Sequence, residues 1–286
     1  MSGDLLQMTD ETKDNFVIPT PDAGFLQEMA GTFPHREDFS ELESGIHELR
    51  AASLFKSFGK KKVVQGVDFS VRTGEVLGLL GPNGSGKTTS FYMIVGFYKP
   101  TAGEVFLDEE CITKLPMYKR AKKGISYLPQ EPSVFKKMTV EENIWSILET
   151  RNDLTNEKKK NLLEDLIEEF SITRIRRQKA YTLSGGERRR TEIARSLAID
   201  PKFLLLDEPF AGIDPIAVSD LKKMIKILKE RGIGILITDH NVRDTLEITD
   251  RAIIINAGEI ITQGTKAEIL EDDKARQIYL GQDFSM

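Results

Sequence analysis

Two glycine-rich segments of this 286-residue chain have the composition of anion-binding turns. The first, GPNGSGKTT, follows the apolar run EVLGLL and fits the pattern G-x-x-x-x-G-K-[ST]. Its glycines let backbone N–H groups point at the β- and γ-phosphates, its lysine adds positive charge, and a threonine hydroxyl can ligate Mg²⁺. The segment therefore predicts a nucleotide phosphate site, as opposed to a strand-to-helix turn without ligand. The residues assigned to it are Gly81, Pro82, Asn83, Gly84, Ser85, Gly86, Lys87, Thr88 and Thr89.

The second segment is TLSGGERRR, about a hundred residues further along the chain. Ser184 and Glu187 have the spacing of a capping box, so one interpretation is simply a well-capped helix start. The free N–H groups and positive end of such a helix also bind phosphate. We therefore assign Ser184, Gly185, Gly186 and Glu187 to a second phosphate cradle. The chain therefore has two predicted phosphate cradles, at 81–89 and at 184–187, and neither motif by itself explains why there are two.

Two carboxylates follow the apolar run FLLL in the segment FLLLDEPF. A buried strand ending in an acidic residue predicts that Asp207 orients a magnesium shell. Glu208 is expected to position or polarise the attacking water, a general-base role worth roughly 10²–10⁴-fold in rate. The alternative is a solvated strand end, which the four apolar residues before the pair and Pro209 after it disfavour.

Two further polar residues lie where they can contact the same phosphates. Gln130, in YLPQEP, has an amide that can face both the metal and the water, although a glutamine in a loop is often only a loop residue. His240, in LITDHNV, follows another apolar run, where a γ-phosphate sensor is expected; a purely structural histidine is the alternative. No Cys or His cluster has metal-ligand spacing.

The hydrophobic pattern predicts an α/β fold. Short continuous apolar runs at 75–80, 203–206, 234–238 and 252–256 are typical of parallel strands buried on both faces. Alternation in VDFSVRTGE predicts a half-buried antiparallel strand, and 103–112 is expected to belong to another hairpin. The stretch VSDLKKMIKILKERG has helical periodicity and stops at Gly232.

A mostly helical block is predicted over about 139–200. Thr139 and Glu142 have capping-box spacing, and EKKKNLLEDLIEEF carries one apolar stripe. The stripe contains Leu162, Leu163, Leu166, Ile167 and Phe170. At this spacing Trp145 and Phe170 are better explained as core than as a ligand box.

Composition limits the class of protein. The single cysteine, Cys111, excludes an internal disulfide, no apolar run is long enough to cross a bilayer, and the acidic start lacks the order of a secretory signal. We therefore expect a soluble cytoplasmic protein. Residues 1–48 hold eleven acidic and two basic residues, a net charge of −9, so the remainder carries +4 of the chain's −5. We interpret 1–48 as a largely disordered extension, with a small folded cap as the alternative.

Five motifs together carry a family resemblance: GPNGSGKTT, LPQE, LSGGERRR, LLLDEPFAGID and LITDHN. Their order and spacing over about 49–286 resemble an ATP-binding-cassette (ABC) ATPase. The resemblance implies a P-loop fold with an antiparallel β subdomain, a helical subdomain at about 130–200, and ATP and Mg²⁺ as cofactors.

The resemblance also implies residue roles. Residues 184–187 would be the signature motif, Gln130 the Q-loop, Asp214 the D-loop and His240 the switch histidine. Phe58 occupies the place of the aromatic residue that stacks on adenine, and Val63 is assigned to the same nucleotide site. Catalytic roles fall to Glu208, His240, Gln130 and Lys87, and metal contacts to Thr88, Gln130 and Asp207.

In this family the P-loop of one subunit faces the signature motif of another, which would explain the two cradles. The resemblance therefore implies a homodimer on the cytoplasmic face of the inner membrane, bound to transmembrane permease subunits, with membrane contact only through those partners. The mild positive charge gives little support for nucleic acid binding.

The stretches ITDHNVRDT and YLGQDF most resemble the ATPases that power lipopolysaccharide export in Gram-negative bacteria. Two alternatives stay open: an importer ATPase of the branched-chain amino-acid type, and a soluble cassette protein that acts on DNA or the ribosome. The second is disfavoured because the chain has one set of motifs and no room for a long coiled coil. The acidic extension departs from the pattern of the export ATPases. Phe135, after the Q-loop, is either an exposed anchor for a membrane subunit or part of the core.

Overall fold

The computed structural model describes residues 45–280, so most of the predicted acidic extension lies outside the described residues. A six-stranded sheet in the order β10-β9-β3-β8-β7-β6 forms the centre. Its strands are β3 (Val76–Leu80), β6 (Ile125–Leu128), β7 (Phe203–Asp207), β8 (Gly234–Thr238), β9 (Arg251–Asn256) and β10 (Glu259–Gly264). All neighbours pair in parallel except β10, which is antiparallel to β9. The four predicted parallel strands are confirmed, whereas β6 and β10 escaped prediction.

The parallel strands are apolar throughout because both faces of the sheet are covered. On β7, Phe203 and Leu205 join one buried cluster while Leu204 and Leu206 join another. β8 divides its side chains in the same way. Each strand therefore connects two hydrophobic cores.

A four-stranded antiparallel sheet, in the order β2-β1-β4-β5, contributes to the first core. Its strands are β1 (Glu48–Phe58), β2 (Lys61–Arg72), β4 (Ala102–Leu107) and β5 (Glu110–Cys111). The predicted alternation on β2 is confirmed, since Val67, Phe69 and Val71 are buried, and β4 with β5 forms the predicted hairpin. Helix α2 (Lys87–Val95) belongs to this core as well.

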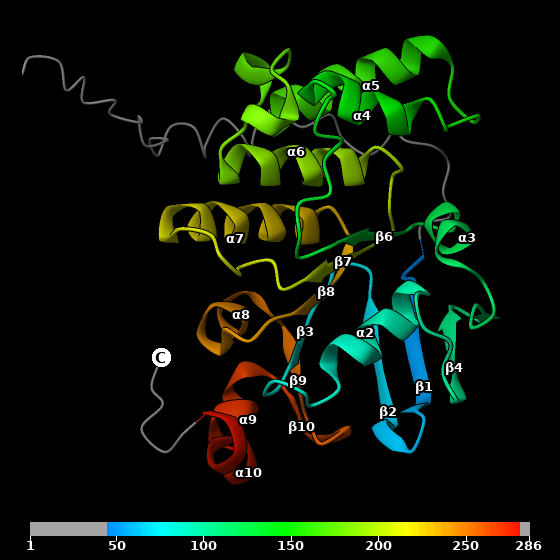
Figure 1. Ribbon diagram of the computed structural model, residues 1–286, viewed down its shortest axis with the longest axis vertical. Coiled ribbons are helices and arrows are strands. Elements are labelled where there is room, and N and C mark those ends of the chain that lie inside the picture. The colour runs from blue at the N-terminus through cyan, green and yellow to red at the C-terminus, as the bar shows by residue number, and fades with distance from the viewer. Residues whose placement is uncertain (1–44, 281–286) are drawn as a thin grey trace, which may run out of the picture. The chain divides into compact units, whose positions relative to one another are not determined.

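Helices α4 (Val140–Leu148), α5 (Asn156–Glu169), α6 (Gly185–Leu197) and α7 (Pro215–Glu230) form the second core. Two 3₁₀ turns, η2 (Thr173–Ile175) and η3 (Ala180–Thr182), lead into α6. The predicted capping box of α4 is present, and most of the predicted apolar stripe of α5 is buried. Trp145 packs partly buried against this core, and Phe170 is buried in it, as predicted. Figure 1 shows α6 and α2 well apart, with α7 and the sheet between them.

The remaining helices complete the fold. A third buried cluster joins Leu80 and Ile254 to α8 (Val242–Ile248), α9 (Lys266–Glu271) and α10 (Asp273–Ala275), which is followed by the π-helical turn η4 (Arg276–Leu280). The short α3 (Met117–Lys122) precedes β6. Within residues 45–280, every helix is too short or too polar to span a bilayer.

A buried arginine holds the C-terminal end of α2. The Arg120 guanidinium donates to the carbonyl oxygens of Met93 and Ile94 in the last turn of α2, at 2.8 and 2.5 Å. It also donates to the carbonyls of Leu115 and Thr113. Burial lowers the pKa of Arg120 to about 10, so the group stays charged at neutral pH. The positive charge stabilises the negative end of the helix and satisfies carbonyls that have no helical partner.

We expect Arg120→Lys to lower the free energy of unfolding by about 2–3 kcal/mol, because one ammonium group cannot reach four carbonyls. Urea unfolding followed by circular dichroism measures the change. Arg177→Lys, the same substitution at an exposed position, is the matched control. An Arg120→Lys value within about 0.5 kcal/mol of wild type would show that the buried bonds contribute little.

Candidate active site

The predicted phosphate loop connects β3 to α2 and needs glycine at two positions in particular. Gly81 has φ +148° and Gly86 has φ +106°. A Cβ atom on Gly81 would lie 2.0 Å from the Ile255 carbonyl oxygen, and one on Gly86 would lie 2.7 Å from the Val63 carbonyl oxygen. The backbone of this loop is therefore packed so closely against β9 and β2 that no side chain fits there.

The N-terminus of α2 has no side chain to cap it. Its N-cap residue, Gly86, makes no capping hydrogen bond, whereas α4 and α6 both begin with complete capping boxes. Uncapped N–H groups at a helix start bind anions. The hydroxyl of Ser85, in the same loop, is buried without a hydrogen-bond partner in the described part of the chain. Both features fit a loop that is completed by phosphate oxygens.

Lys87 lies at the start of α2, where it is almost fully buried. Its ammonium donates to the carbonyl oxygens of Gly81 and Pro82, at 2.5 and 3.0 Å. Burial lowers the pKa of Lys87, and the negative charges of Glu208 and Asp239 act in the opposite direction. The positive charge is thus held inside the loop by backbone oxygens, close to carboxylates of the neighbouring strands.

Asp207 and Glu208 stand at the carboxyl end of β7 and make different contacts. Asp207 is buried and accepts a 2.7 Å hydrogen bond from the Thr238 hydroxyl. The backbone N–H of Glu208 donates to the Thr238 carbonyl oxygen at 2.8 Å. Glu208 has φ +42°, in the left-handed region, so the chain turns sharply at this residue. Thr238, on β8, therefore holds both acidic residues.

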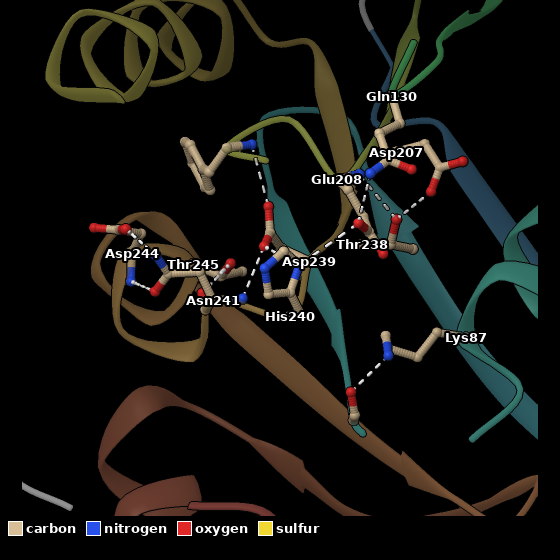
Figure 2. A network of polar contacts seen from close by, with 12 residues as sticks. Lys87, Gln130, Asp207, Glu208, Thr238, Asp239, His240, Asn241, Asp244 and Thr245 are labelled. Carbon is tan, nitrogen blue, oxygen red and sulfur yellow. Dashed lines mark hydrogen bonds and ion pairs between the residues drawn. The ribbon is translucent and has the colours of Figure 1, made fainter. Parts of the chain in front are cut away.

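Gln130 and His240 converge on one carboxylate oxygen of Glu208. The Gln130 amide donates to Glu208 Oε2 at 3.0 Å, and His240 Nδ1 lies 3.5 Å from the same oxygen. Figure 2 shows the three side chains pointing toward one another from loops that follow β6, β7 and β8. The structure thus brings together three residues that are separated by 78 and 32 positions in the sequence.

Phe58 and Val63 lie near the tip of the β1–β2 hairpin, and Val63 approaches the phosphate loop. The close approach of Gly86 to the Val63 carbonyl places this hairpin beside the loop. The Phe58 ring is about half exposed, with the Tyr98 ring edge-on at 5.4 Å and the Lys56 ammonium at 5.1 Å. An exposed ring at this position is available for stacking.

The second predicted cradle begins α6. Ser184 and Glu187 form the predicted capping box: the Ser184 N–H and hydroxyl donate to the Glu187 carboxylate at 2.9 and 2.7 Å. A Cβ added to Gly185 would meet nothing within 4 Å. Packing within one chain therefore does not require glycine here, in contrast to Gly81 and Gly86.

The two cradles belong to different cores. Helix α2 packs with the antiparallel sheet on one face of the parallel sheet, and α6 packs with α4, α5 and α7 on the other. Figure 1 shows the start of α6 remote from the phosphate loop at the start of α2. One chain therefore cannot close both cradles on the same nucleotide.

Comparison with known proteins fixes the family. The family model described as ABC transporter matches residues 64–211. The lipopolysaccharide export system ATP-binding protein LptB of Haemophilus influenzae is 52% identical over 238 residues, which cover 83% of this chain and 99% of the relative. The protein of the same name from Escherichia coli K12 is 49% identical over the same shares. The chain belongs to the ABC-transporter ATPases.

Solved structures agree with this assignment. An ABC-transporter cassette in its ADP conformation superposes on this ABC ATPase with a TM-score of 0.73 and 32% identity, covering 82% of this chain and 99% of that one. A nucleotide-free cassette gives the same score and identity. The predicted P-loop ATPase fold is thereby confirmed, and nucleotide is the ligand class of this fold.

Two polar residues of this ABC ATPase site were missed by sequence reasoning. Thr238 and Asp239 lie between the apolar run of β8 and His240, and neither was assigned a role. Both are buried, Thr238 bonding to Asp207 and Asp239 bonding to the backbone of Phe210 and Asn241. The available signal was a polar residue at the end of an apolar strand, followed directly by an acidic one.

We expect Glu208→Gln to reduce ATP hydrolysis at least about a hundredfold while ATP binding stays near wild type, because the amide keeps the shape of the side chain but cannot act as a base. Steady-state hydrolysis and equilibrium nucleotide binding measure the two effects.

Glu131→Gln removes an exposed carboxylate next to Gln130 and serves as the control. Hydrolysis by the Glu208 variant within about threefold of wild type would remove this residue from the chemistry.

Proposed function

We propose that two copies of the chain close two ATP molecules between them, each held by the phosphate loop of one copy and the start of α6 of the other. The observation that carries this proposal is the placement of the two cradles on opposite faces of one sheet. The open space around Gly185 and the uncapped start of α2 support it, since both are surfaces that one chain leaves unfilled.

In this proposal Glu208 polarises the attacking water. Gln130 and His240 hold the Glu208 carboxylate in place, because both lie within 3.5 Å of its Oε2 atom. The same two residues respond to the presence of a γ-phosphate. Lys87 exchanges its two carbonyl partners for phosphate oxygens. Ser184, Gly185, Gly186 and Glu187 serve the nucleotide of the partner. Phe58 stacks on the adenine, with Val63 beside it.

Mg²⁺ fits the donor set. Thr88 is exposed in the first turn of α2, Asp207 offers a carboxylate whose Oδ1 accepts from Thr238, and Gln130 offers an amide oxygen. Within residues 45–280 no group of three or more His, Cys, Asp or Glu side chains could hold a metal by itself. This suits Mg²⁺, which is usually held by one or two carboxylates together with substrate phosphates. When bound, the ion would neutralise charge on the β- and γ-phosphates.

We propose lipopolysaccharide export as the process that this ATPase powers. The support is the similarity to the two LptB proteins, which spans 99% of their length. The chain would work at the cytoplasmic face of the inner membrane and would reach the membrane through permease subunits.

Phe135 is the proposed contact with those subunits. Its side chain is 49% exposed, with the Arg195 guanidinium 5.2 Å from the ring centroid. Asn143 fixes the backbone of Phe135 from both sides, accepting from its N–H at 2.8 Å and donating to its carbonyl at 3.2 Å. Because Phe135 follows Gln130 by only five residues, it can present an aromatic anchor to a partner close in the chain to the γ-phosphate contact.

Reconstitution tests the proposal. We expect the chain, purified from membranes with its bound subunits and placed in liposomes that contain lipopolysaccharide, to release lipopolysaccharide when ATP is supplied. Phe135→Ala should reduce recovery of the membrane subunits at least about fivefold and leave nucleotide binding unchanged, since interface aromatics often dominate binding energy.

Tyr118→Ala removes another exposed aromatic, on α3, and is the control. Amino-acid uptake in place of lipopolysaccharide release would favour an importer ATPase, and normal recovery of the subunits by Phe135→Ala would remove that residue from the interface.

A further inference from the structure

Asp239 is a fully buried carboxylate between two loops of the active site. It directly precedes His240, and its exposed fraction is 0%. Oδ1 accepts the N–H of Asn241 at 2.8 Å, at the start of α8. Oδ2 accepts the N–H of Phe210 at 3.2 Å, in the loop of residues 209–214 that joins β7 to α7. Figure 2 shows the Asp239 carboxylate between these two backbone segments.

Each loop held by Asp239 carries a proposed functional residue. The 209–214 loop begins directly after Glu208 and ends at Asp214, whose side chain caps α7 by accepting from the N–H groups of Ile216 and Ala217 at 3.0 Å. The other loop carries His240, and Oδ1 of Asp239 lies 3.5 Å from His240 Nδ1. The same nitrogen lies 3.5 Å from Glu208 Oε2. The carboxylates of Asp239 and Glu208 therefore flank one imidazole nitrogen.

A carboxylate is the side chain that this position requires. The two N–H groups approach different oxygens, so both oxygens must act as acceptors. Burial raises the pKa of Asp239, and the hydrogen bonds from Asn241 and Phe210 counteract that effect. A buried charge costs stability unless it is hydrogen-bonded, which makes a purely space-filling role a poor explanation for Asp239.

We propose that Asp239 is a positioning residue that fixes the 209–214 loop and His240 relative to each other, so that His240 faces Glu208 only while this loop is in place. The inference rests on the proposed role of His240. Through its carboxylate, Asp239 would connect the segment that contains Asp214 to the segment that contains His240, by accepting one backbone N–H from each.

Asp239→Asn is the informative variant because an amide of the same shape has one acceptor oxygen where the carboxylate has two. One of the two loops must lose its bond. We expect kcat for ATP to fall about tenfold with KM within about twofold of wild type, since misplacement of a catalytic group lowers turnover more than substrate affinity. Amide hydrogen exchange should become faster in 209–214 or at 240–241, without a general increase in the rest of the chain.

Asp244→Asn is the matched control. It neutralises a carboxylate in the first turn of α8 that accepts from Lys222 at 2.7 Å, and the expected kcat is that of wild type. If kcat of Asp244→Asn falls as much as kcat of Asp239→Asn, the proposal is overturned. That result would show that any loosening of α8 is enough to lower turnover. Should Asp239→Asn fail to fold, Asp239→Ser, which is smaller and keeps one acceptor oxygen, is expected to show the same selective loss of kcat.

His240→Ala separates this inference from the proposed function. If this variant hydrolyses ATP normally, the proposed role of His240 is wrong and the role of Asp239 falls with it. If His240→Ala is inactive but Asp239→Asn keeps wild-type kcat and wild-type exchange in 209–214, the positioning role alone is overturned.

Discussion

The parallel pairing of β3, β8, β7 and β6 is the constraint on which the site depends. Parallel strands bring their carboxyl ends to one edge of the sheet, and ligands of open α/β sheets bind outside that edge. Here the phosphate loop follows β3, Gln130 follows β6, Glu208 follows β7 and His240 follows β8. Residues from four distant parts of the sequence therefore meet without any of them needing a long loop.

Hydrogen bonds at that edge of the sheet also orient the acidic side chains. Thr238 holds Asp207 through its hydroxyl and the backbone of Glu208 through its carbonyl. The left-handed φ of Glu208 then turns its side chain away from Asp207 and toward Gln130 and His240. Asp207 and Thr238 are both buried, so water is excluded from the hydrogen bond between them, which strengthens that bond. In the phosphate loop, by contrast, the start of α2 has no side-chain cap and the Ser85 hydroxyl has no hydrogen-bond partner within residues 45–280.

The four central strands were predictable from the sequence, because short apolar runs such as FLLL and GILIT are typical of parallel strands covered on both faces. β6 was missed because ISYL is short and Ser126 interrupts it; the structure buries that hydroxyl against the Ser196 carbonyl oxygen of α6. β10 was missed because its side chains are mostly half exposed. The contact between Asp239 and Phe210 was beyond sequence reasoning, since the two residues lie 29 positions apart and Phe210 contributes only a backbone N–H.

Complementation between two inactive variants tests the shared site most directly. Lys87→Ala removes the charge of the phosphate loop, and Gly185→Asp places a negative charge at the start of α6, where it suits the helix but repels phosphate. Each variant alone should be inactive. Mixed at equal concentration, they should recover about a quarter of wild-type hydrolysis, because about half of the dimers are mixed and each of those has one intact site. A mixture that stays as inactive as its components would contradict the account.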